Sequence, residues 1–156
     1  MSRGLSIFAI AGGLVACGGA PAPAPVEQAR QEKPKPPDEA RRFPKDGQTS
    51  MELVDDQLLG KDFLPGGNLA SYEKDGNPYQ QFLIVAKDPE SAALLSFEIK
   101  GKLAAAKLIP HFGGYFGMDG ETPWFIFPKD KYVAGVVGLP QEEADLVARD
   151  FAARIN

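Results

Sequence analysis

Residues 131–138 read KYVAGVVG, and the pattern of this stretch decides the fold that we expect. In an extended strand, Tyr132, Ala134 and Val136 lie on one face, and the small or apolar residues between them lie on the other. Strands that are apolar on both faces are typical of the interior of a sheet. The stretch therefore predicts a central β-strand.

Other strands are expected before this one along the chain. They are runs of aromatic and aliphatic residues bounded by turn signals, at 69–74, 79–86 and 124–127. Asp75-Gly76-Asn77 predicts a hairpin turn between the first two runs. Two other stretches are less specific. Residues 102–110 allow helix or strand, and residues 51–59 favour a short helix with Thr49 or Ser50 as its N-cap.

A helix is predicted directly after the hairpin. Asp88-Pro89-Glu90-Ser91 is a typical start, because Asp caps free backbone N–H groups, Pro fits the first turn and Glu suits the positive end of the helix dipole. We expect this helix to end near Glu98 and to bury Ala93, Leu94 and Phe97.

A second helix is predicted at the end of the chain. Pro140 begins it, and its acidic first turns and basic later turns suit the helix dipole. Its apolar residues recur at helical spacing: Ala144, Val147, Ala148, Phe151, Ala152 and Ile155. Together the elements predict an α+β fold, an antiparallel sheet of about five strands with two or three helices packed on one face.

The N-terminus has the three parts of an export signal. Arg3 supplies a positive charge, residues 5–16 are uncharged and mostly apolar, and the small residue Ala16 precedes Cys17. As a helix, this apolar stretch would reach only ~18 Å, which is too short to cross a hydrocarbon core of ~30 Å. We therefore expect a cleaved signal peptide rather than a membrane-spanning helix.

Leu14-Val15-Ala16-Cys17 resembles the lipobox of bacterial lipoproteins. The resemblance implies cleavage between Ala16 and Cys17, followed by acylation of the Cys17 thiol and of its new amino group. The lipid bilayer is thus an expected partner, because several acyl chains hold a protein firmly on a membrane. Gly18 resembles the residue that permits transfer to the outer membrane in Gram-negative bacteria, which predicts a protein facing the periplasm. The alternative is an ordinary secretory signal with an incidental cysteine.

The segment after the cysteine is expected to be a disordered tether. It is poor in apolar residues and rich in proline, which lacks a backbone donor and interrupts helices and sheets. We therefore divide the chain into a signal peptide (1–16), a lipidated tether (17–46) and one globular domain (47–156). The alternative role for the tether is a proline-rich ligand for a groove on another protein.

The charge and the cysteine count limit the partners. Residues 47–156 hold ten Lys or Arg and sixteen Asp or Glu, a net charge of −6. An acidic domain repels nucleic acid, and this charge also argues against a domain that lies flat on anionic lipid. The single Cys excludes an internal disulfide, and one His does not supply the usual ligands of a zinc site.

The sequence offers few candidates for catalytic or metal-binding residues, and we expect no metal, cofactor or catalytic residue. The sequence has no haem-attachment, serine-elbow or phosphate-loop motif. His111 is the only candidate imidazole base, and a structural histidine at a strand edge is the favoured interpretation. The glycine-rich segment 113–117 favours a tight strand crossing. The alternative is an aromatic ligand surface made by Phe112, Tyr115, Phe116 and Trp124.

From about residue 69 to residue 155, the order of the pieces resembles an uncharacterised bacterial family of exported and lipoprotein-type domains. The resemblance depends on the strand near Tyr72, the helix start at 88–93, segment 113–117, the strand at 131–133 and the Ala-rich last helix. That family has no assigned activity. We therefore expect a non-catalytic binding or scaffolding domain for an unknown envelope protein. The alternative is a small periplasmic enzyme that uses carboxylates or His111.

Overall fold

The predicted central strand is β7 (Tyr132–Val137), and all six of its residues are buried. In the computed structural model, which describes residues 33–156, β7 lies between β3 (Asn77–Val85) and β6 (Thr122–Lys129). The expected cleavage and lipidation positions, Ala16 and Cys17, lie outside the described residues.

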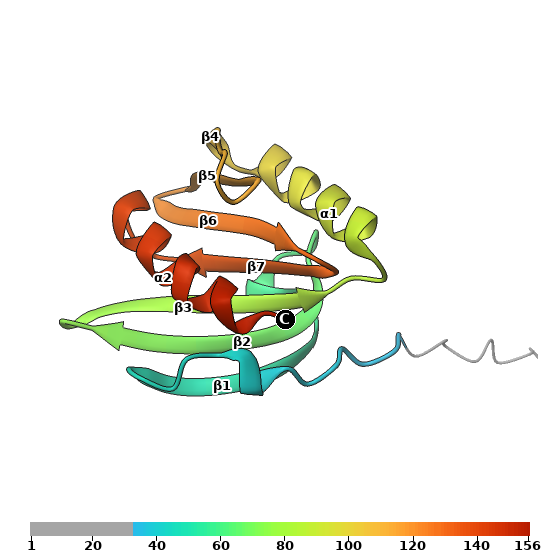
Figure 1. The fold of residues 1–156 in the computed structure, drawn as a ribbon, viewed down its shortest axis with the longest axis horizontal. Helices are drawn as coiled ribbons and strands as arrows, with labels where there is room; N and C mark the ends of the chain where they lie inside the picture. Colours follow the sequence, from blue (N-terminus) through green and yellow to red (C-terminus); the bar gives the residue numbers. More distant parts are fainter. Residues whose placement is uncertain (1–32) are drawn as a thin grey trace, which may run out of the picture. The chain divides into compact units, whose positions relative to one another are not determined.

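One antiparallel sheet contains all seven described strands, in the order β1-β2-β3-β7-β6-β5-β4 (Figure 1). The remaining strands are β1 (Gln48–Asp56), β2 (Pro65–Lys74), β4 (Ala104–Ile109) and β5 (Gly114–Asp119). The turn between β2 and β3 is a two-residue one, with Asp75 at φ 52° and Gly76 at φ 78°, as the sequence signal predicts. The α+β class and the antiparallel sheet are confirmed, with more strands than the five expected.

The helix expected at residues 51–59 is wrong, because most of this stretch belongs to β1. β1 pairs with β2 from Gln48 opposite Tyr72 to Asp56 opposite Pro65. Met, Glu and Leu are good helix formers, but helix propensities of ordinary residues differ by less than about 1 kcal/mol, so pairing with a neighbouring strand overrides their preference. A short 3-10 turn, η2 (Leu58–Gly60), follows and buries Leu58. The ambiguous stretch 102–110 is mostly the edge strand β4.

Within residues 33–156 the two α-helices, α1 (Pro89–Lys102) and α2 (Gln141–Arg154), cover opposite faces of the sheet, which corrects the expectation of helices on one face. The α2 face is the cluster that includes Ala70, Leu83, Phe125, Ala134 and Phe151. The α1 face is the cluster that includes Leu69, Phe82, Ala92, Ile99 and Trp124. Strands that are apolar on both faces, as β7 is, require cover on both.

Helix α1 begins where the sequence predicts, but a different side of the helix faces the sheet than expected. The Asp88 side chain accepts a hydrogen bond from the Ser91 backbone N–H at 2.7 Å and caps the helix. Its buried residues are Ala92, Ser96 and Ile99, whereas Leu94 and Phe97 are each 59% exposed. Apolar residues occur all around this helix, so helical spacing alone did not identify the inner side.

Helix α2 agrees with its predicted stripe. Ala144, Ala148 and Phe151 are buried, and Ile155 directly after the helix is also buried. Each α-helix has 14 residues, and within residues 33–156 no helix is long and apolar enough to cross a bilayer.

The compact unit begins at Lys33, earlier than the expected domain start at residue 47. Phe43 is 1% exposed, and its ring lies 4.9 Å from that of Phe151 on the α2 face. The short 3-10 helix η1 (Ala40–Arg42) precedes it. The expected tether boundary at residue 46 is therefore corrected, because the buried side chain of Phe43 packs this segment into the core on the α2 face.

Candidate functional site

The four aromatic residues considered as a ligand surface do not lie together. Trp124 is 2% exposed and packs against Phe82 on the α1 face, with ring centroids 5.9 Å apart, and Tyr115 lies on that same face. Phe112 and Phe116 pack on the α2 face. The sheet separates the two pairs, so they do not form one aromatic surface.

Two glycines of segment 113–117, Gly114 and Gly117, serve close packing, and Gly113 has a positive φ of 62°, as the favoured interpretation holds. A Cβ on Gly114 would overlap the Ile126 carbonyl oxygen and Phe127. A Cβ on Gly117 would lie 2.8 Å from the Leu103 Cβ. Side chains at these two positions would push β5 away from its neighbours.

His111 belongs to a charged cluster that links the β4–β5 connection to α2. Its Nε2 lies 2.5 Å from Asp145 Oδ1, and Arg149 Nε donates to Asp145 Oδ2 at 2.6 Å. The His111 side chain is 50% exposed, whereas that of Asp145 is 18% exposed. Partial burial opposes ionisation of Asp145, but hydrogen bonds from Arg149 and His111 outweigh it and lower the pKa of this carboxyl below 3.8.

The lowered pKa of Asp145 predicts an acid-sensitive contribution to stability. A carboxyl whose pKa is lowered by folding stabilises the fold fully above its unfolded pKa and loses this effect as pH falls through its folded pKa. We expect the free energy of unfolding of Asp145→Asn to depend less on pH than that of the wild type below pH 3.8. Urea titrations at a series of pH values would measure this. Arg149→Gln removes one of the hydrogen bonds to Asp145 and should also reduce the pH dependence of the free energy of unfolding. Equal pH dependence in Asp145→Asn and wild type would show that Asp145 does not contribute this acid-sensitive stability.

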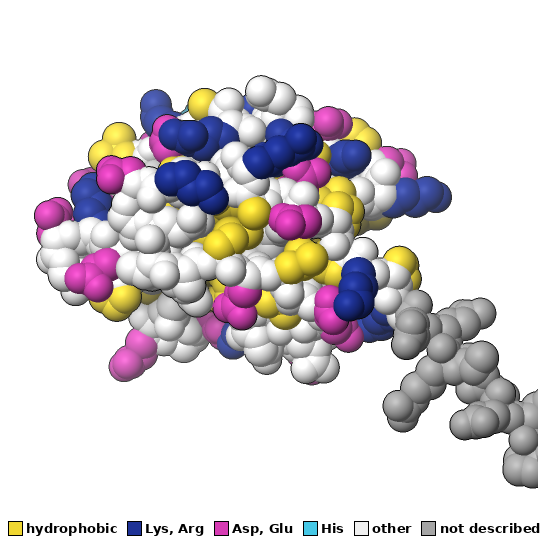
Figure 2. All heavy atoms as spheres, turned by 90° about the horizontal axis from the view of Figure 1, so that it is seen from below, with side chains coloured by type: hydrophobic (Ala, Val, Ile, Leu, Met, Phe, Trp, Pro, Cys, Tyr) yellow, Lys and Arg dark blue, Asp and Glu magenta, His cyan; other side chains and the backbone are white. Residues whose placement is uncertain are grey.

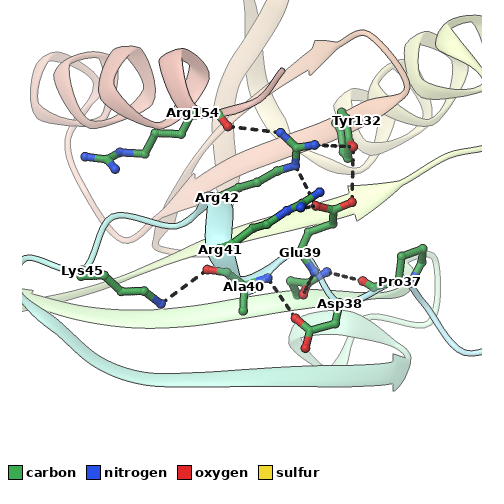
Figure 3. A network of polar contacts seen from close by, with 10 residues as sticks. Pro37, Asp38, Glu39, Ala40, Arg41, Arg42, Lys45, Tyr132 and Arg154 are labelled. Atoms are coloured by element: carbon green, nitrogen blue, oxygen red, sulfur yellow. Dashed lines mark hydrogen bonds and ion pairs between the residues drawn. The ribbon is translucent and has the colours of Figure 1, made fainter.

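A nearly buried polar network surrounds Glu39, just before η1 (Figure 3). Arg42 Nε donates to Glu39 Oε2 at 2.8 Å, and the two side chains are 12% and 11% exposed. The Tyr132 hydroxyl accepts from Arg42 Nη2 at 3.0 Å and donates to Glu39 Oε1 at 3.4 Å. A third nitrogen, Arg42 Nη1, donates to the backbone carbonyl of Arg154 at 3.3 Å. One guanidinium therefore joins η1, β7 and the end of α2.

Two further side chains from the sheet hold the same segment. Asn68 accepts from the Glu39 backbone N–H and donates to the Pro37 carbonyl, both at 2.9 Å. The Tyr72 hydroxyl donates to the Pro44 carbonyl at 2.8 Å. We call residues 37–44 the strap. Its backbone groups bond to buried side chains of β2, which stabilises the strap in one position because these buried side chains would otherwise lack partners.

The strap is the feature that the sequence analysis missed. Proline content was averaged over residues 17–46, which hid a local change of composition near residue 39. Two signals were present: Glu39 and Arg42 stand three residues apart, the spacing of an ion pair on one helical turn, and the aromatic Phe43 follows them.

Two of the open hollows on the described part of the chain have volumes comparable to those of small-molecule sites. The first, of about 480 Å³, lies between residues 33–37 and the ends of β1 and β2. Lys33 and Asp56 are 3.0 Å apart there, with side chains 77% and 43% exposed, so this ion pair adds little stability. The second, of about 360 Å³, lies beside Tyr79 and Gln80 on β3.

Figure 2 shows one face of the described domain, seen from below the view of Figure 1. Most of the Lys and Arg side chains on this face lie in its upper half, with others beside acidic side chains at the lower right, while Asp and Glu side chains are dispersed. In the described part of the chain, no three His, Cys, Asp or Glu side chains are grouped as metal ligands.

Comparisons with known proteins give a fold and no family. No protein-family model matches the chain, and no curated protein matches it. A crystal structure of a GTP binding regulator from Thermotoga maritima is similar, with a TM-score of 0.50 and 12% sequence identity. The similarity covers 69% of this chain and 75% of that one. At this identity it supports the α+β architecture alone.

Proposed function

We propose that this protein is a bacterial envelope lipoprotein, acylated at Cys17 and held on the outer membrane with its domain in the periplasm. The domain is a non-catalytic binding or scaffolding module for another envelope component. The observation that carries the anchor is the stretch Leu14-Val15-Ala16-Cys17 after an apolar run of export-signal length.

The strap supports a role in which the position of the domain matters. Because residues 37–44 bond to buried side chains, the chain leaves the domain at one defined point. The strap begins at Pro37, twenty positions after Cys17. A fully extended chain of that length reaches at most roughly 70 Å, against roughly 100 Å for a tether that ended at residue 46. A domain on this shorter chain stays close to the membrane.

Replacement of the expected acylation site should have a clear effect. We expect Cys17→Ser to abolish metabolic labelling with a fatty acid, since serine lacks the thiol, and to leave the protein uncleaved or in the soluble fraction. Val15→Ala is the matched control, because alanine at this position keeps the motif and should keep full labelling. Equal labelling of Cys17→Ser and wild type would refute the anchor.

A second candidate function is a small enzyme based on His111. The observation in its favour is the contact of His111 Nε2 with Asp145, since a carboxylate that orients an imidazole is a recurring arrangement in general-base catalysis. His111→Ala separates the two functions. It should leave capture of an envelope partner by the solubilised protein unchanged if the domain is a binding module, whereas an enzyme would lose turnover with its fold intact.

A further inference from the structure

The outer side of α1 carries a stripe of residues whose two central members, Leu94 and Phe97, are apolar and largely exposed in the described chain. Glu90, Leu94, Phe97 and Gly101 follow one another at intervals of four, three and four residues, which places them on one side of the helix. Leu94 and Phe97 are each 59% exposed. The opposite side of α1 packs on the sheet through Ala92, Ser96 and Ile99, so this helix is apolar on both sides.

The stripe continues onto the neighbouring strands. The Lys100 ammonium lies 4.9 Å from the centre of the Phe97 ring and 5.5 Å from that of Tyr115 on β5. Tyr115 pairs with Leu108 of β4, which is 56% exposed. Leu94, Phe97, Tyr115 and Leu108 therefore make one surface, which we call the α1 patch. Large exposed apolar patches on soluble domains mark interaction sites.

Charge is arranged along α1 so that the stripe complements itself. The first turn carries Glu90, and the last turn carries Lys100 and Lys102. When two copies of α1 pack antiparallel with Leu94 opposite Phe97, Glu90 of each copy lies opposite Gly101, between the two lysines of the other. Opposite charges then meet at both ends, and the antiparallel helix dipoles also attract. Nothing lies within 4 Å of the position of a Cβ on Gly101, so the second helix can approach closely.

We propose that the α1 patch is the interface of a twofold-symmetric dimer, with a second copy of this chain as its occupant. In such an interface the same surface of each copy meets its counterpart, so every contact occurs twice. Addition of a strand at β4 is disfavoured, because Ala105 at φ 51° and a register shift between Ala104 and Lys107 interrupt this edge. The proposal goes beyond the envelope function and does not depend on acylation.

The first test is the oligomeric state of residues 33–156, which contain all described strands and helices and both apolar clusters. Sedimentation velocity up to about 0.5 mM should show a monomer–dimer equilibrium, the weak association that a small interface gives. Phe97→Ser should weaken dimerisation at least about tenfold, because one substitution removes two buried rings. Leu146→Ser is the matched control, since Leu146 is 65% exposed on α2, and it should leave the dimer unchanged.

The second test reverses the charges. Glu90→Lys alone should weaken the dimer, because it places like charges opposite each other. Addition of Lys100→Glu and Lys102→Glu to the same chain should restore dimerisation, since the charges at both ends of α1 are then reversed and opposite charges meet again. Surface substitutions of this kind leave the fold intact, which circular dichroism would check.

Three results would overturn the proposal. The wild-type domain stays monomeric over the whole concentration range, or its dimer is insensitive to Phe97→Ser, or the triple charge reversal is no better than Glu90→Lys alone. A monomer that sediments with lipid vesicles, and loses this binding in Phe97→Ser, would assign the α1 patch to the bilayer surface instead.

Discussion

Arg42→Ala should destabilise the domain by about 3 kcal/mol, because it leaves the Glu39 carboxylate nearly buried without its main partner. The remaining neighbours of this carboxylate are more distant: the Tyr132 hydroxyl at 3.4 Å and Arg41 Nε at 3.5 Å. For a domain of this size, a loss of ~3 kcal/mol lowers the melting temperature by roughly 10 °C. Thermal and urea denaturation would measure both quantities.

Arg41→Ala is the matched control for Arg42→Ala. Arg41 is adjacent in sequence and also near Glu39, but its side chain is 77% exposed, so its removal should cost less than ~0.5 kcal/mol. The double variant Glu39→Ala/Arg42→Ala should be more stable than the sum of the single losses implies, because no unpaired charge is left. Equal effects of Arg41→Ala and Arg42→Ala would contradict the proposed role of the network.

Gly135→Ala should destabilise the domain by about 3 kcal/mol, although it adds a single methyl group. Gly135 of β7 lies directly opposite Phe82 of β3, and the Phe82 ring occupies the space of the missing side chain. Phe82 is 0% exposed, and Trp124 packs against its ring, so it has little freedom to move aside. Chemical denaturation at low protein concentration would give the loss.

Gly101→Ala, in contrast, should raise the stability of the domain. A Cβ at Gly101 meets nothing within 4 Å, and alanine favours helix over glycine by about 0.5–1 kcal/mol.

The double variant Gly135→Ala/Phe82→Leu should lose less stability than the sum of the two single losses, because the smaller side chain at position 82 makes room for the methyl group. Strict additivity would show that Phe82 is not the obstacle.

The sequence predicts the elements whose signals are local. The Asp88 cap, the Asp75-Gly76 turn and the buried stripe of α2 each depend on neighbouring residues, and each is confirmed. β1 was predicted as helix because its pairing partner, β2, is specified by residues outside the stretch itself. The two-sided apolar pattern of β7 already required cover on both faces, so the expectation of helices on one face conflicted with a signal in the same sequence.

The candidate sites depend on placement in space, which one sequence specifies less well. The segment around residue 115 is rich in aromatic residues, but strand alternation sends Tyr115 and Phe116 to opposite faces. The helix beginning at Pro89 has more apolar residues than its inner side uses, so the exposed Phe97 was taken for core. Contacts such as Glu39 with Tyr132 join residues 93 positions apart, and no local pattern indicates them.

Intact mass spectrometry of the mature protein, purified from membranes, tests the central claim most directly. The account predicts a chain that begins at Cys17, with a mass raised by a diacylglyceryl group on sulfur and an acyl group on the amine. A chain that begins elsewhere, or a Cys17 with a free thiol, would contradict it.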